Sequence, residues 1–194
     1  MKRLLLAAAL SLATALPAMA QTVVIVRHAE KADASADPVL SAAGQARAQA
    51  LAAALNDAHP SLVLTSPLQR TILTAAPTVA YHSAPSEAVS LEGGGAAHIA
   101  ATVARVRALP QDATVLIVGH SNTVPAIARA LGYAEAADMP ECEYDRMTTL
   151  HLMGEGPAHG ERDVPGDPPG VPERGPDLPR HLGQRAAHDH AVAE

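Results

Sequence analysis

The amino-acid sequence predicts an α/β fold in which a mainly parallel central sheet carries helices on both faces. Between residues 22 and 153, short runs of branched apolar residues alternate with Ala-rich or amphipathic segments of helical length. The runs at 23–26 and 115–118 are continuously apolar, which is typical of strands covered on both faces. Alternation of strand and helix indicates βαβ units, and these place their strands parallel in one sheet.

The first half of the domain supplies two strands and two helices. A strand at 23–26 precedes a helix that runs to about residue 55 and that Ser41 can cap. A second strand at 62–64 precedes a helix that begins at Pro67. The apolar stripe expected on that second helix consists of Leu68, Ile72, Ala75 and Val79.

The second half repeats the pattern with weaker signals. A strand is expected at 88–91, and three glycines separate it from the next helix. The inward side of that helix is expected to carry Ile99, Val103, Val106 and Leu109. The strand at 115–118 leads to a helix with Pro125 in its first turn. The last strand is expected at 147–153.

The N-terminal segment, residues 1–20, has the features of a cleavable secretory signal peptide. It begins with Lys2 and Arg3, continues with an apolar stretch and ends in the small-residue site Ala18-Met19-Ala20. We therefore expect a mature chain from Gln21 that is periplasmic or secreted and has no stable membrane insertion after cleavage. An uncleaved membrane anchor is the alternative.

Composition divides the rest of the chain at residue 153. Residues 21–153 form the expected single domain. Residues 154–194 are rich in Pro, Gly and charged residues and poor in apolar ones, so we expect them to be disordered. The histidines of this tail fit no defined metal site.

Charge and cysteine content exclude several classes of protein. The formal net charge of −6 argues against a general nucleic-acid-binding protein. The single cysteine, Cys142, excludes an internal disulfide and is expected to be a half-buried hydrophobic residue. Nothing in the sequence indicates an oligomeric state.

Four basic side chains are expected to meet at one edge of the sheet. Arg27 and His28 end the first strand, and His120 follows the strand at 115–118. Ligands of open parallel sheets bind beyond the carboxyl ends of the strands, where both histidines would lie. Arg70 reaches the same edge in the first turn of its helix. Two arginines and two histidines form a cationic site for a dianion such as phosphate.

The residues of this site suggest a reaction as well as a ligand. Neutral imidazole is a competent nucleophile toward phosphorus, and neighbouring cations favour the neutral form of His28. His120 can donate to phosphoryl oxygens, and a general acid is still needed for the leaving alkoxide. Ser121 and Asn122 are close enough to contact a ligand, although Asn122 can equally cap the following helix.

Four stretches, in this order, resemble the histidine phosphatase superfamily, the phosphoglycerate mutase-like proteins: VRHAEK, LSAAG, LTSPLQRTILTA and VGHSNT. The resemblance covers residues 22–153 and implies a three-layer α/β/α sandwich of the phosphoglycerate mutase-like type. It also implies that His28 is the phosphorylated nucleophile, that no metal or other cofactor is required, and that the phosphoryl group is bound by Arg27, Arg70 and His120.

The resemblance also implies an acidic proton donor beyond the second arginine, in the loop before the next helix. Glu92, which directly precedes the three glycines, is the best-placed candidate. Glu87 lies behind it, and Asp145 is another possible residue of the site.

The expected function is therefore a phosphomonoesterase that hydrolyses a phosphorylated small molecule through a phosphohistidine on His28. One alternative is a non-catalytic periplasmic protein that binds a phosphorylated ligand. A second is a phosphatase of phosphohistidine in proteins, which export makes less attractive because the usual partners are cytoplasmic. A third is metal binding or partner docking by the histidines of residues 154–194.

Overall fold

Nine elements alternate along residues 20–153, the part of the chain that the computed structural model describes. The segments expected to be a signal peptide and a disordered tail lie outside these residues, apart from Ala20. The elements are β1 (Gln21–Arg27), α1 (Ala42–Ala54), β2 (Leu62–Thr65), α2 (Gln69–His82), β3 (Ser86–Ala88), α3 (Gly94–Arg107), β4 (Thr114–Gly119), α4 (Val124–Ala130) and β5 (Met147–Leu152).

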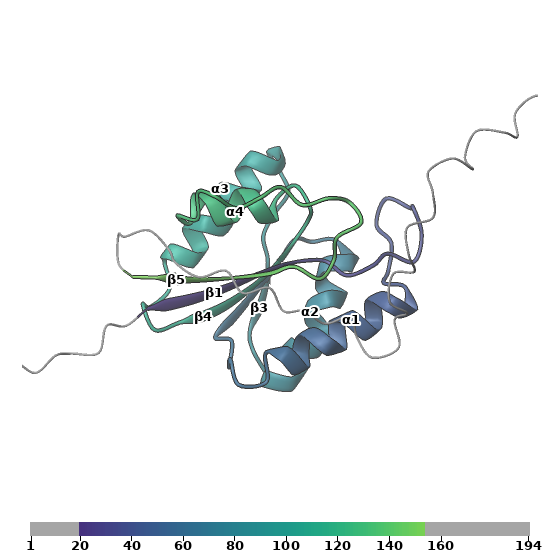
Figure 1. The fold of residues 1–194 in the computed structure, drawn as a ribbon, viewed down its shortest axis with the longest axis horizontal. Helices are drawn as coiled ribbons and strands as arrows, with labels where there is room; N and C mark the ends of the chain where they lie inside the picture. Colours follow the sequence, from purple (N-terminus) through teal and green to yellow (C-terminus); the bar gives the residue numbers. More distant parts are fainter. Residues whose placement is uncertain (1–19, 154–194) are drawn as a thin grey trace, which may run out of the picture.

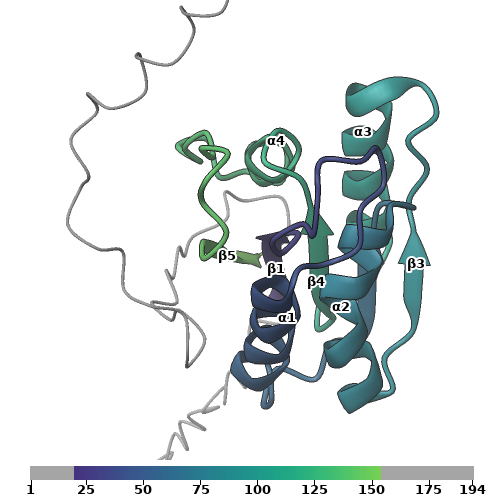
Figure 2. The same ribbon diagram turned by 90° about the vertical axis from the view of Figure 1, so that its right-hand side faces the viewer.

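The strands form one sheet in the order β3-β2-β4-β1-β5 (Figure 1). The pairs β2–β3, β2–β4 and β1–β4 are parallel, and β5 runs antiparallel to β1 at one edge. Helices α1 and α2 cover one face of the sheet, and α3 and α4 cover the other (Figures 1 and 2). The predicted three-layer sandwich with a mainly parallel sheet is confirmed.

The two faces of β1 explain its run of branched apolar residues. Val23 and Ile25 pack with residues of α3 and α4, whereas Val24 and Val26 pack with residues of α1 and α2. Successive side chains of a strand point to opposite faces, so a strand between two helical layers must be apolar at every position. The chain has no Phe or Trp, and the core consists mainly of Val, Leu, Ile and Ala.

Two details of the predicted elements are wrong. The strand expected at 88–91 lies at Ser86–Ala88, and all of its residues are exposed at the edge of the sheet. Helix α2 buries Thr71, Thr74, Ala75 and Thr78. Ile72, expected on the apolar stripe, is instead 44% exposed.

Helix α1 passes very close to the loop that follows the first strand. As predicted, Ser41 caps this helix, accepting a hydrogen bond from the Gly44 N–H at 3.1 Å. A β-carbon on Gly44 would lie 2.3 Å from the carbonyl oxygen of Glu30, which is a backbone atom and cannot swing aside. The glycine in LSAAG therefore allows α1 to approach the loop that carries His28.

Replacing Gly44 with Ala is expected to lower the free energy of unfolding by about 1–3 kcal/mol, because backbone must move to admit the methyl group. Chemical denaturation measures this change. Gly95→Ala is the control: nothing lies within 4 Å of a β-carbon there, so it should leave stability unchanged or slightly raised. Equal stabilities of the two variants would contradict the close approach.

Within residues 20–153, no helix has both the length and the apolar character needed to cross a lipid bilayer.

Candidate active site

The carboxyl ends of β1 and β4 bring two histidines together. Arg27 is opposite Gly119 in the parallel register, and the His28 N–H donates to the Gly119 carbonyl at 2.9 Å. The imidazole rings of His28 and His120 lie with centroids 5.3 Å apart at 62° to each other. Both side chains are buried. The adjacency expected from the two strand ends is present.

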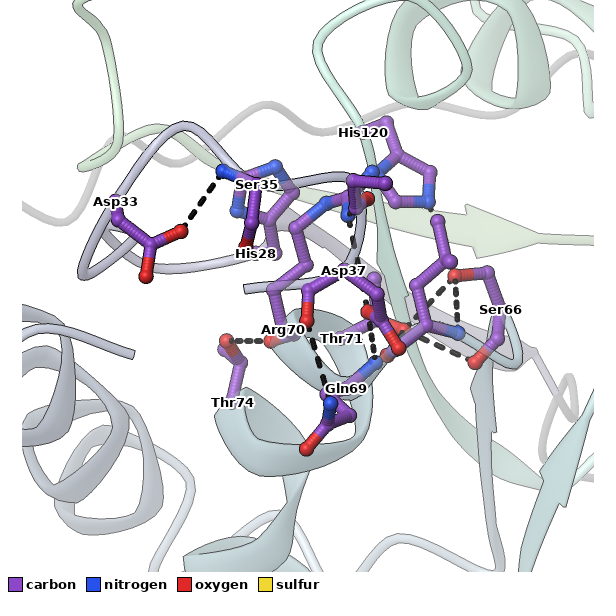
Figure 3. Close-up of polar contacts among 12 residues, drawn as sticks. His28, Asp33, Ser35, Asp37, Ser66, Gln69, Arg70, Thr71, Thr74 and His120 are labelled. Carbon is purple, nitrogen blue, oxygen red and sulfur yellow. Dashed lines mark hydrogen bonds and ion pairs between the residues drawn. The ribbon is translucent and has the colours of Figure 1, made fainter. Parts of the chain in front are cut away.

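Arg70, in the first turn of α2, extends toward both imidazoles (Figure 3). Its Nη1 donates to the Ala36 carbonyl at 3.2 Å and lies 3.9 Å from the Asp37 carboxylate. Asp37 also accepts a hydrogen bond from the backbone N–H of Gln69 at 2.8 Å, which fixes the start of α2. The loop after β1 thus holds both the helix and its arginine in place.

His28 presents one ring nitrogen as a free lone pair. Its Nδ1 lies 2.8 Å from the carbonyl oxygen of Ala29, which can only accept, so Nδ1 carries the proton and Nε2 does not. The Ala29 N–H donates to the Thr74 hydroxyl at 2.9 Å, and that hydroxyl donates to the Arg70 carbonyl at 2.7 Å. Thr74 therefore ties the loop that carries His28 directly to the turn of α2 that carries Arg70. Figure 3 shows the bond from Thr74 to Arg70.

His120 is held by a serine at the end of β2. Its Nε2 lies 3.0 Å from the hydroxyl of Ser66, which also contacts the Thr71 hydroxyl at 2.9 Å (Figure 3). Ser66 is fully buried. The contact engages Nε2, so Nδ1 is the ring nitrogen of His120 that is available to a ligand.

Both histidines are neutral at pH 7. Burial, followed by the charges of Arg27, Arg70 and Lys31, lowers the pKa of His28 to about 4, against a raising effect of the Ala29 hydrogen bond. Burial and the charge of Arg70 lower the pKa of His120 to about 3.

Arg27 binds the loop between α4 and β5. Its Nη1 donates to the carbonyls of Pro140, Glu141 and Glu143 at 2.8–3.0 Å, and its Nη2 to the Glu141 carboxylate at 3.0 Å. The ring of Tyr144 stacks over the guanidinium, 4.2 Å from Cζ. The guanidinium is buried by this loop, although its Nε–H remains without a partner among the described residues.

Several residues singled out in the sequence lie elsewhere or make other contacts. Glu30, in the VRHAEK stretch, pairs with Arg47 of α1 at 2.7 Å. Cys142 is exposed, not half-buried as expected. Ser121 donates to the Glu141 carboxylate at 2.7 Å, and Asn122 is exposed.

The candidate acids are not joined to the histidines. Glu92 is exposed before α3, where its N–H donates to the Ser90 hydroxyl, and in residues 20–153 it has no hydrogen bond or ion pair to the four basic residues. Glu87 pairs with Arg105 at 2.8 Å, and Asp145 is half-buried.

Sequence reasoning missed three residues of the site: Ser66, Glu141 and Tyr144. The signal for Ser66 was its position in LTSPLQRT, just after a strand. The other two lie more than 110 positions from Arg27, in a segment without a regular pattern.

As for metal ligands, the described residues include no group of three or more His, Cys, Asp or Glu side chains that could hold a metal ion.

Comparison with known proteins places this site in a family. The family model of the histidine phosphatase superfamily (branch 1) matches residues 23–91, which include Arg27, His28 and Arg70. No curated protein sequence matches the chain.

Solved structures extend the likeness to most of the domain. A candidate phosphohistidine phosphatase SixA from Nakamurella multipartitia is 30% identical, with a TM-score of 0.52 over 70% of this chain and 86% of that one. The fold is shared with the protein histidine phosphatase SixA complexed with tungstate, at 22% identity and a TM-score of 0.57 over 71% of this chain and 92% of that one. It is also shared with the mycobacterial glucosyl-3-phosphoglycerate phosphatase, at 17% identity and a TM-score of 0.51 over 68% of this chain and 90% of that one. With the paired histidines at the strand ends, the matched motifs and the identity to the Nakamurella protein, this chain belongs to the histidine phosphatase superfamily.

Proposed function

We propose that the protein is a phosphomonoesterase that hydrolyses a phosphorylated small molecule through a phosphohistidine on His28, without a metal ion. Membership of the histidine phosphatase superfamily supports a phosphatase. The observation that carries the finer proposal is a pair of buried, unpartnered donors. In residues 20–153, the Nε–H groups of Arg27 and Arg70 are buried without an acceptor, beside the free Nε2 of a neutral His28.

Unpartnered buried donors are costly, and a phosphoryl group would satisfy both of them. Each arginine would offer charge-assisted hydrogen bonds to phosphoryl oxygens. His120 would offer a third contact through Nδ1. The four side chains that parallel strands bring to one edge thus fit a single tetrahedral dianion.

The reaction follows from this arrangement in two steps. The Nε2 lone pair of His28 attacks phosphorus, an N–P bond forms, and the P–O bond to the leaving alcohol breaks as its oxygen takes a proton. Water then attacks phosphorus, the N–P bond breaks, and inorganic phosphate leaves with Nε2 regenerated. Arg27, Arg70 and His120 stabilise charge on the equatorial oxygens in both steps. Glu92 is the proposed donor of the first proton.

An assay with p-nitrophenyl phosphate tests this function. We expect turnover that survives a metal chelator and that vanadate, an analogue of the phosphorane-like transition state, inhibits. In the same assay Glu92→Gln should slow an alkyl phosphate more than the aryl phosphate, whose leaving group needs no acid. Tight vanadate binding without turnover of any phosphate in a broad panel would instead identify a non-catalytic binding protein.

A second candidate is dephosphorylation of phosphohistidine in a protein. Two observations favour it: the likeness to the candidate SixA protein, and the lack of a hydrogen bond between Glu92 and the basic residues in the described chain. A protonated imidazole is a good leaving group and places little demand on a separate acid. Faster hydrolysis of a phosphohistidine-bearing protein than of any small phosphate ester would decide for this substrate.

We also propose that the protein is exported, on the strength of the N-terminal segment alone. Mass spectrometry of the protein from the periplasmic fraction should find a chain that begins at Gln21. Recovery of the full-length chain from the cytoplasm would contradict this location.

A further inference from the structure

A carboxylate lies directly on the anion-binding residues of the site. Glu141 accepts a hydrogen bond from Nη2 of Arg27 at 3.0 Å through one oxygen and from the hydroxyl of Ser121 at 2.7 Å through the other. Arg27 immediately precedes His28, and Ser121 immediately follows His120. The Glu141 carboxylate therefore bridges the two strand ends that supply the histidines.

This carboxylate is held in position although its side chain is 83% exposed. Three backbone carbonyls of its loop, including that of Glu141 itself, accept from Nη1 of the buried Arg27. Tyr144 stacks over Cζ of Arg27, and the centroid of its ring lies 6.1 Å from that of His28. The loop and the site are thus built around the same arginine.

The bonding of Arg27 limits what it can offer a ligand. Both protons of Nη1 are donated to carbonyl oxygens, and one proton of Nη2 is donated to Glu141. The Nε–H and the second proton of Nη2 therefore remain for a ligand. A phosphoryl group that accepts from the Nε–H and from the second proton of Nη2 would share Nη2 with Glu141. Two acceptors on one nitrogen lie about 5 Å apart, given hydrogen bonds of ordinary length. A hydrogen bond from Ser121 and the charge of Arg27 lower the pKa of Glu141, so the carboxyl is ionised at neutral pH.

The direction of attack by His28 points the leaving group of the substrate toward solvent. His28 is buried and must attack in line, so the departing alcohol points away from it toward solvent. Glu141 is exposed to solvent and contacts Arg27, the residue next to His28. The substrate group attached to the phosphoryl oxygen passes close to a fixed negative charge.

We propose that Glu141 is a specificity-determining residue, which disfavours phosphate esters with a second anionic group near the phosphorus and favours those with a cationic group there. This inference rests on the proposed phosphatase function. It narrows the substrate class to monophosphates whose alcohol portion is cationic or neutral, such as esters of amino alcohols, and excludes phosphorylated short-chain acids as good substrates.

Three small esters of similar size test the inference: phosphoethanolamine, ethyl phosphate and phosphoglycolate, which are cationic, neutral and anionic beyond the phosphate. Each is measured as a competitive inhibitor of p-nitrophenyl phosphate hydrolysis. In the unaltered protein, phosphoethanolamine should bind most tightly and phosphoglycolate most weakly. In Glu141→Gln, affinity for phosphoglycolate relative to ethyl phosphate should rise about 3- to 10-fold, as expected for one exposed charge at this separation. Relative affinity for phosphoethanolamine should fall.

Each affinity is expressed as a ratio to the affinity for ethyl phosphate, because this ratio removes any general effect of the substitution on phosphate binding. Glu135→Gln is the matched control, because Glu135 is exposed, lies earlier in the same loop and carries the same charge, and it should leave both ratios unchanged. Unchanged ratios in active Glu141→Gln would overturn the inference and leave the phosphatase proposal standing. Slower turnover of ethyl phosphate with unchanged turnover of the aryl ester would also overturn it, because Glu141 would then be the proton donor. Absence of p-nitrophenyl phosphate turnover in the unaltered protein would count against both proposals.

Discussion

Replacing His28 with Asn is expected to lower kcat/KM toward p-nitrophenyl phosphate by about a thousandfold or more, because the variant has no atom that can accept the phosphoryl group. Asn is close in size to His and can keep the contact with the Ala29 carbonyl through its amide. Binding of inorganic phosphate should therefore survive, since Arg27, Arg70 and His120 are unaltered. A loss of kcat with retained phosphate affinity distinguishes removal of a nucleophile from collapse of the site.

The same variant tests for the covalent intermediate. Rapid quenching of the unaltered protein at alkaline pH, where phosphohistidine is stable, should trap a phosphorylated peptide that contains residue 28, and His28→Asn should yield none. His151→Asn is the control, because His151 lies exposed on β5 and contacts only Thr22 among the interactions of the described chain. It should keep full activity and the trapped phosphopeptide. Substantial activity in His28→Asn would show that another group carries the reaction.

The strand ends of the site could be predicted because parallel strands obey simple geometry. A continuous apolar run identifies a strand between two helical layers, and its last residues must lie at the carboxyl edge of the sheet. That reasoning places His28 beside His120 without knowledge of any loop. Arg70 follows because it lies in the first turn of the helix after the neighbouring strand, β2.

The contacts of Arg27 could not be predicted in this way. Its acceptors are carbonyl oxygens of an irregular loop some 113 to 116 positions away, and carbonyls carry no signature in the sequence. The buried side of α2 was hidden for a different reason. Thr71 and Thr74 hydrogen-bond to the carbonyls of Leu68 and Arg70 within their own helix, so their polar atoms are satisfied and can be buried. A search for apolar spacing finds Ile72 instead.

The buried histidines also make stability depend on pH in a direction that can be worked out. In the unfolded chain both histidines titrate near 6.5, whereas in the folded protein the pKa is about 4 for His28 and about 3 for His120. Between these values the unfolded state binds more protons than the folded state, so the free energy of unfolding rises with pH. The contribution is fully present above about pH 6.5 and is lost as the pH falls toward about 4 for His28 and about 3 for His120. Each histidine changes the free energy of unfolding by at most about 1.4 kcal/mol per pH unit.

We therefore expect the free energy of unfolding to fall by a few kcal/mol between pH 7 and pH 4.5, measured by chemical denaturation in buffers without phosphate. Most carboxyl groups titrate below this range, so the upper part of the loss reports the histidines. His120→Asn separates the two effects, because it removes one titrating group and leaves an amide near Ser66. Its stability should depend less steeply on pH than that of the unaltered protein over this range, with the remaining slope due largely to His28. Identical slopes for the two proteins would mean that His120 binds the same number of protons in the folded and unfolded states, so that its pKa is not lowered in the fold. His120 would then become cationic beside Arg27 and Arg70 as the pH falls below about 6.5.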